Sequence, residues 1–126
     1  MQYTMTTLPG GDGPRVLVAE DDGALRAVLA RCLQAAGLRV TTAVDGLDAL
    51  KHADSTFGLL VTDLQMPGLD GRSLAERLRA TRPELGILYL SGAEKLAFPL
   101  PERAEFLPKP FGLKAFKAAV DRLLAG

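Results

Sequence analysis

Apolar runs recur along this chain, separated by segments with a different polar pattern. The run at residues 59–62 is apolar almost throughout, which is typical of a central strand covered on both faces. The run at residues 38–42 instead alternates apolar and polar side chains, which favours a strand at the edge of a sheet. Strands are therefore predicted at residues 15–19, 38–42, 59–62, 87–90 and 106–107.

Helical patterns follow the strands. Asp22 is expected to cap the first helix and Gly37 to end it. The apolar stripe of this helix is predicted to consist of Leu25, Val28, Leu29, Cys32 and Ala36. A short helix is predicted after Asp45, a third helix opens at Asp70, and the last begins near Leu113.

The segment between the fourth and fifth strands is short. Pro99 and Pro101 prevent a long regular helix there, so at most one or two helical turns are expected within residues 93–98. Strands that alternate with helices in this way form right-handed parallel crossovers, with helices on both faces of the sheet. The pattern predicts an α/β fold with a doubly wound, five-stranded parallel sheet in the order 2-1-3-4-5 and a short or irregular fourth helix.

Length and composition narrow the possible functions. The 126 residues suit one domain, predicted at 15–126, and residues 1–14 are expected to form a flexible tail or linker without the pattern of a secretory signal. The formal net charge is zero, and no apolar stretch approaches the roughly 20 residues that span a bilayer. A single cysteine, Cys32, excludes an internal disulfide and fits a reducing compartment, so we expect a cytoplasmic protein and a buried helical thiol.

Acidic residues follow the first and third strands. In the predicted strand order, the switch point lies between these two strands, where open α/β sheets bind their ligands. Glu20, Asp21 and Asp63 are therefore expected to project there together. Two carboxylates about 4 Å apart repel each other by on the order of 4 kcal/mol at an effective dielectric near 20. Such a group favours a hard cation, and Mg²⁺ fits best; the alternative is a solvated loop with a helix cap.

Asp63 also has the position of a nucleophile. A carboxylate can attack phosphorus and form an acyl phosphate. Lys109 lies between two prolines after the last strand, and Ser91 ends the fourth strand. Both are expected to reach the same edge of the sheet and to bind oxygens of an incoming phosphoryl group.

Four motifs in order resemble those of the two-component receiver domain. They are the acidic pair Glu20–Asp21 and the segments 62–68, 90–92 and 107–111. The resemblance covers residues 15–124. It implies a flavodoxin-like fold and a signalling domain rather than an enzyme, in which phosphohistidine of a histidine kinase or histidine phosphotransfer protein donates a phosphoryl group to Asp63 in a Mg²⁺-dependent step.

The resemblance also implies roles for individual residues. The metal ligands would be Glu20, Asp21, Asp63 and the backbone carbonyl of Gln65. Ser91 and Lys109 would bind the phosphoryl group, with a cis peptide bond between Lys109 and Pro110. Phe106 has the position of the aromatic switch residue, which turns inward when the Ser91 hydroxyl moves toward phosphate. Gln65 and Ala93 have positions that tune the lifetime of the acyl phosphate.

Other functions remain open at this point. An aspartyl-phosphate hydrolase of haloacid dehalogenase type requires a second acid two residues after the nucleophile, where this chain has Gln65. A flavodoxin-like nucleotide carrier requires a loop rich in glycine after the first strand, and a phosphorylation-independent interaction module requires no site at all. His52 is expected on the surface. We expect no nucleic-acid binding by this chain alone, no membrane association, and a monomer or weak dimer, either as a separate receiver or as part of a hybrid histidine kinase.

Overall fold

Strands and helices alternate in the computed structural model, which describes residues 13–125. The strands are β1 (Arg15–Ala19), β2 (Arg39–Ala43), β3 (Phe57–Asp63), β4 (Gly86–Ser91) and β5 (Ala104–Pro108). The helices are α1 (Gly23–Ala35), α2 (Gly46–His52), α3 (Gly71–Thr81) and α4 (Leu113–Ala125). Most of the predicted tail, residues 1–12, lies outside the described residues.

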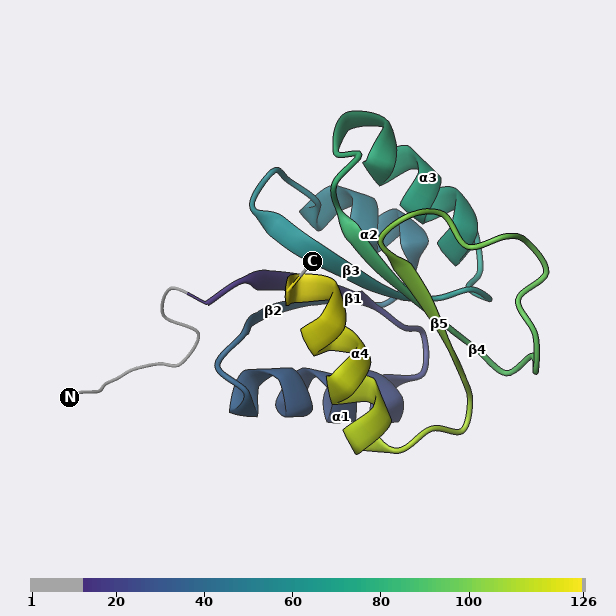
Figure 1. Ribbon diagram of the computed structural model, residues 1–126. Helices are drawn as coiled ribbons and strands as arrows, with labels where there is room; N and C mark the ends of the chain where they lie inside the picture. Colours follow the sequence, from purple (N-terminus) through teal and green to yellow (C-terminus); the bar gives the residue numbers. More distant parts are fainter. Residues whose placement is uncertain (1–12, 126) are drawn as a thin grey trace.

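All five strands are parallel and form one sheet in the order β2-β1-β3-β4-β5, which confirms the predicted topology. Helices α1 and α4 cover one face of the sheet, and α2 and α3 cover the other (Figure 1). The three strands in the middle, β1, β3 and β4, are almost completely buried, whereas β2 at the edge is largely exposed or half-buried. Because all the strands are parallel, their carboxyl ends lie along one edge of the sheet, where a site can form.

Aspartate side chains cap the first three helices, and the cap predicted at Asp22 is confirmed. Asp22 accepts hydrogen bonds from the backbone of Ala24 and Leu25 at the start of α1. Asp45 and Asp70 accept similar bonds at the starts of α2 and α3. Each cap satisfies backbone N–H groups that have no partner within the helix.

The apolar stripe predicted for α1 is partly wrong. Val28 is 44% exposed and Ala36 is also exposed, while Leu33 is fully buried against the sheet and Cys32 is only half-buried. The buried face centres on Leu29 and Leu33, four residues apart, and the partly buried Leu25 and Cys32 pack beside them against the core shared with α4. The predicted stripe thus included two exposed residues, Val28 and Ala36, and omitted the buried Leu33.

Residues 92–103 connect β4 to β5 without a helix, consistent with the irregular segment predicted there. Phe98 packs this connection onto the domain. Its ring and that of Tyr89 form a T-shaped pair with a centroid distance of 5.3 Å, and the guanidinium of Arg72 on α3 lies 4.3 Å from the centroid of Phe98. The helix labelled α4 is thus the one that follows β5.

Replacing Phe98 by alanine is expected to lower the free energy of unfolding by about 2 kcal/mol, because both the aromatic pair and the cation–π contact are lost. Urea denaturation measures the change. Leu100→Ala is the matched control in the same connection: Leu100 is 46% exposed, so its loss should cost less than about 0.5 kcal/mol. Equal effects of the two variants would show that Phe98 does not anchor the connection.

Among residues 13–125, no helix has the length and apolar character needed to cross a membrane.

Candidate functional site

The side chains singled out from the sequence meet at the carboxyl edge of the sheet. Glu20 directly follows β1, Asp63 ends β3, Ser91 ends β4, and Lys109 directly follows β5. Because these strands are neighbours in the order β1-β3-β4-β5, parallel pairing brings their ends together. Residues far apart in the chain thus form one site.

A close approach of backbone fixes the loop after Asp63. The amide of Gly71 at the start of α3 donates to the carbonyl of Leu64 over 3.1 Å. A Cβ atom at position 71 would lie 2.1 Å from the Asp63 carbonyl oxygen, so only glycine fits there. The start of α3 is therefore packed directly against the end of β3, and Asp63 is held by the frame of the fold.

Three carboxylates form a compact group. Glu20, Asp21 and Asp63 each offer an oxygen, and these oxygens all lie within 4.8 Å of one another. Glu20 is fully buried and Asp63 is 5% exposed, whereas Asp21 faces solvent. The group is thus open on the side of Asp21 and closed on the side of Glu20.

Lys109 is the counter-ion of this group. Its Nζ atom lies 3.0 Å from Oε1 of Glu20 and 3.2 Å from Oδ2 of Asp63. The second oxygen of Glu20 accepts a hydrogen bond from the backbone N–H of Asp22 over 3.0 Å. Both oxygens of the buried carboxylate therefore have partners, as burial of a charged group requires.

Burial and charge act in opposite directions on these groups. Burial raises the pKa of Glu20, and the nearby charge of Asp63 adds to this, although the Asp22 N–H and Lys109 favour the ionised form. For Lys109, burial favours the neutral amine, but the hydrogen bond to Glu20 and the charges of Glu20 and Asp63 outweigh it and raise the pKa of the ammonium. Lys109 is therefore a permanent positive charge at the site.

The charge balance indicates what else the group can bind. Three carboxylates facing one ammonium leave an excess of two negative charges among these four side chains. Carboxylate oxygens are the ligands of hard divalent cations, and the exposure of Asp21 leaves room for a cation to keep part of its water shell. The residues present therefore fit Mg²⁺.

Ser91 and Gln65 border the carboxylates. The Ser91 hydroxyl is almost completely buried and accepts a hydrogen bond from the backbone N–H of Ala93 over 3.1 Å. The backbone N–H of Gln65 donates to Oδ1 of Asp63 over 3.2 Å. The backbone N–H of Lys109 donates to the Ser91 carbonyl over 2.6 Å, and the bond between Lys109 and Pro110 is cis, as the resemblance implied.

Two other residues from the sequence lie outside this group. Phe106 is half-buried on β5, opposite Tyr89 of β4 in the strand register. His52 is exposed at the end of α2, which confirms its predicted surface position. Its Nε2 atom lies 3.4 Å from Oδ1 of Asp48.

Sequence reasoning missed Arg26. Its Nη1 atom donates to the backbone carbonyl of Glu20 over 2.8 Å, which ties α1 to the loop that carries the acidic pair. The signal was present in the sequence, since Arg26 lies one helical turn after the cap residue Asp22 and so faces back toward the preceding loop.

Comparisons with known proteins agree with this geometry. Residues 16–121 match the response regulator receiver domain family. Sensor kinase CckA of Brucella abortus (strain 2308) is 36% identical over 116 residues, which cover 86% of this chain and 12% of the kinase. Response regulator receiver protein CpdR of the same organism is 35% identical over 115 residues, which cover 87% of this chain and 96% of CpdR. The chain thus spans nearly all of one relative and a small part of the other.

Solved structures share the fold. The receiver domain of the hybrid histidine kinase CckA superposes with a TM-score of 0.77 at 36% identity, covering 87% of this chain and 98% of that one. Response regulator TrrA from Thermotoga maritima, solved in complex with Mg²⁺ and BeF, superposes with a TM-score of 0.76 at 28% identity, covering 88% and 99%.

The family match extends over most of the chain, and the fold and the acidic site agree with it. The hydrolase of haloacid dehalogenase type and the nucleotide carrier are therefore not favoured. This chain belongs to the response regulator receiver domain family and is a phosphoacceptor domain of two-component signal transduction.

Proposed function

We propose that Asp63 accepts a phosphoryl group from phosphohistidine of a histidine kinase or a histidine phosphotransfer protein. The observation that supports this most strongly is the contact of Lys109 with both Glu20 and Asp63, which places a fixed positive charge beside a nucleophilic carboxylate at a strand end. In the transfer, an Asp63 oxygen bonds to phosphorus while the phosphorus–nitrogen bond of the donor breaks and nitrogen keeps the electron pair. The product is an acyl phosphate.

The metal ligands in this proposal are Glu20, Asp21, Asp63 and the backbone carbonyl of Gln65. Bound Mg²⁺ would balance the negative charges of the carboxylates and of the phosphoryl oxygens. Support comes from the spacing of the three carboxylates and from their excess negative charge.

Lys109 and Ser91 are proposed to bind the transferred group. Lys109 is positioned to turn its ammonium from the carboxylates to a phosphoryl oxygen. The Ser91 hydroxyl, which now accepts a bond from the backbone N–H of Ala93, can turn and donate to another oxygen. Phe106 is the proposed switch residue, because an inward turn of its ring would follow this movement of Ser91 on the neighbouring strand.

The proposal extends to the setting of the domain. Residues 15–126 form the proposed receiver unit, which acts as a signalling domain that assists its own phosphorylation and dephosphorylation rather than as an enzyme on other substrates. A cytoplasmic location fits the single cysteine and a kinase partner. We propose a monomer or weak dimer that does not bind nucleic acid by itself, in a separate regulator or in a hybrid kinase, the two contexts that the relatives represent.

A labelling experiment tests this function. Incubation of the chain with phosphoramidate and Mg²⁺ is expected to add one acid-labile phosphoryl group, and EDTA is expected to prevent it. Borohydride reduces an acyl phosphate of aspartate to homoserine, so mass spectrometry of the digested product locates the label. Homoserine at position 63 supports the proposal. Label at another residue, or equal labelling in EDTA, contradicts it.

A further inference from the structure

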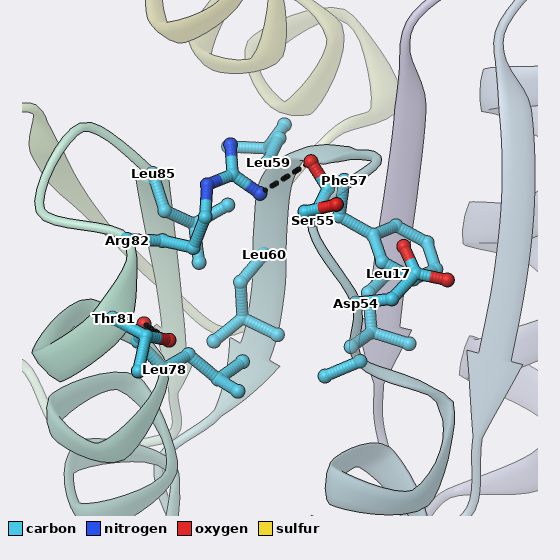
Figure 2. A pocket seen from close by; sticks show the side chains of 11 residues that line it. Leu17, Asp54, Ser55, Phe57, Leu59, Leu60, Leu78, Thr81, Arg82 and Leu85 are labelled. Carbon is cyan, nitrogen blue, oxygen red and sulfur yellow. Dashed lines mark hydrogen bonds between the residues drawn. The ribbon is translucent and has the colours of Figure 1, made fainter.

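An apolar cavity lies at the opposite end of the sheet from the acidic site. Its volume is about 230 Å³, and it is placed between the loop that follows α2 and the end of α3 (Figure 2). Leu17 of β1 and Leu60 of β3 form its floor, and Leu78 and Leu85 form its wall on the side of α3. The cavity therefore lies along the first half of β3, and Asp63 ends the other half.

The interior of this cavity is apolar. Leu17, Leu60 and Leu85 are buried, whereas the polar lining residues Asp54, Ser55 and Thr81 are exposed and so lie at the rim. Within residues 13–125, every buried side-chain nitrogen or oxygen atom has a hydrogen-bond partner. The polar groups are thus confined to the rim, and the apolar interior offers water few partners, which favours an apolar group there.

Arg82 spans the rim. Its Nη1 atom donates to the backbone carbonyl of Ser55 over 2.9 Å, and its Nε atom donates to Glu84 over 2.8 Å (Figure 2 shows the bond to Ser55). A guanidinium group has five N–H donors in a planar fork that matches a carboxylate. Arg82 therefore keeps donors for another acceptor, and a carboxylate is a stronger partner than the neutral carbonyl of Ser55.

The other charges at the rim are already paired. Asp54 lies 3.4 Å from Arg15 and accepts hydrogen bonds from Thr56, and Glu84 pairs with Arg82. The carboxyl ends of α2 and α3 carry only partial negative charges. Their repulsion of an anionic ligand is weaker than the attraction of a guanidinium in direct contact with it. Arg82 also pairs with Glu84, so what it offers a ligand is its remaining N–H donors, which can bind one further carboxylate.

The size of the cavity limits its occupant. An apolar cavity of about 150 Å³ accepts benzene, so about 230 Å³ provides room for one aromatic ring and a short arm. We propose that this cavity binds a small aromatic carboxylate, with its ring between Leu60 and Leu78 and its carboxylate on Arg82. The site is independent of the phosphoacceptor chemistry, because none of its lining residues belongs to the acidic site.

Three probes with the same phenylpropyl skeleton, of which the carboxylate and the amide are also equal in shape, test the proposal on the unmodified chain at pH 7. They are 3-phenylpropanoate, 3-phenylpropanamide and 3-phenylpropylamine, and leucine methyl NMR measures their dissociation constants. We expect the carboxylate to bind about tenfold more tightly than the amide, because only the carboxylate brings a negative charge to the guanidinium of Arg82, and the amine to bind most weakly, because its ammonium is repelled. Methyl signals of Leu17, Leu60 and Leu78 should shift. Equal affinities, or shifts elsewhere, would overturn the proposal.

Two kinds of variant locate the site. Arg82→Gln should weaken binding of the carboxylate about tenfold and leave binding of the amide unchanged. Arg77→Gln, at an exposed position on α3, should change neither. Leu78→Phe fills the cavity and should abolish binding of all three probes, and Ala53→Leu fills it from the other side. Unchanged methyl signals of Leu29 in the opposite core identify a filling variant that has kept its fold. Full binding by a folded, filled variant would refute the site.

Discussion

Replacement of Asp63 by asparagine is expected to abolish acid-labile phosphorylation and, in metal-free buffer, to stabilise the fold. The first effect follows because the amide cannot attack phosphorus. The second follows because Asp63 belongs to a group of three carboxylates that faces one ammonium. Removing one charge should add roughly 1 kcal/mol, or about 4 °C in the unfolding midpoint. Labelling with phosphoramidate and calorimetry measure the two effects.

Asp121→Asn is the matched control. Asp121 is exposed on α4 and pairs there with Lys117. Its replacement should leave labelling intact and change stability by less than about 0.5 kcal/mol. Addition of Mg²⁺ should then stabilise the unmodified chain more than Asp63→Asn, since the variant has lost a ligand. Full labelling of Asp63→Asn would refute the nucleophile, and a lowered midpoint would show that the carboxylates do not repel each other.

Lys109→Met is expected to destabilise the metal-free domain by about 3 kcal/mol. Glu20 is fully buried, and Lys109 is the side chain whose charge it meets. Removing one partner of a buried ion pair leaves the other charge uncompensated, which costs more than the pair contributes. The variant should also lose the phosphoryl contact that we propose for Lys109, so its labelling should be slower.

Lys117→Met separates this effect from the loss of any lysine. Lys117 forms an exposed pair with Asp121 one helical turn away, and such pairs contribute at most about 0.5 kcal/mol. Urea denaturation compares the two variants. Mg²⁺ should restore more stability to Lys109→Met than it adds to the unmodified chain, because the cation replaces the missing charge. Equal losses in the two variants would mean that Glu20 does not depend on Lys109.

Much of the fold and of the site's composition followed from the sequence because parallel strands all end at one edge. Once 59–62 was assigned as a central strand and 38–42 as an edge strand, the order β2-β1-β3-β4-β5 placed Glu20, Asp63 and Lys109 together. The roles of these residues in phosphoryl transfer remain predictions.

Other features depend on packing that the sequence pattern does not contain. The exposure of Val28 and the burial of Leu33 depend on how α1 meets α4. The anchoring of residues 92–103 by Phe98 depends on Tyr89 and Arg72, which come from other elements. The cavity beside Arg82 is a gap between side chains, and gaps leave no periodic signal.

The contact between Lys109 and Glu20 joins residues 89 positions apart in the chain. Because Lys109 directly follows β5, the contact forms only after β5 has been synthesised and has paired with β4. A chain that is still being synthesised therefore contains Asp63 before it contains β5 and Lys109. If Lys109 has the role proposed for it, the order of the strands restricts phosphorylation to the finished domain, because an incomplete chain lacks part of the site.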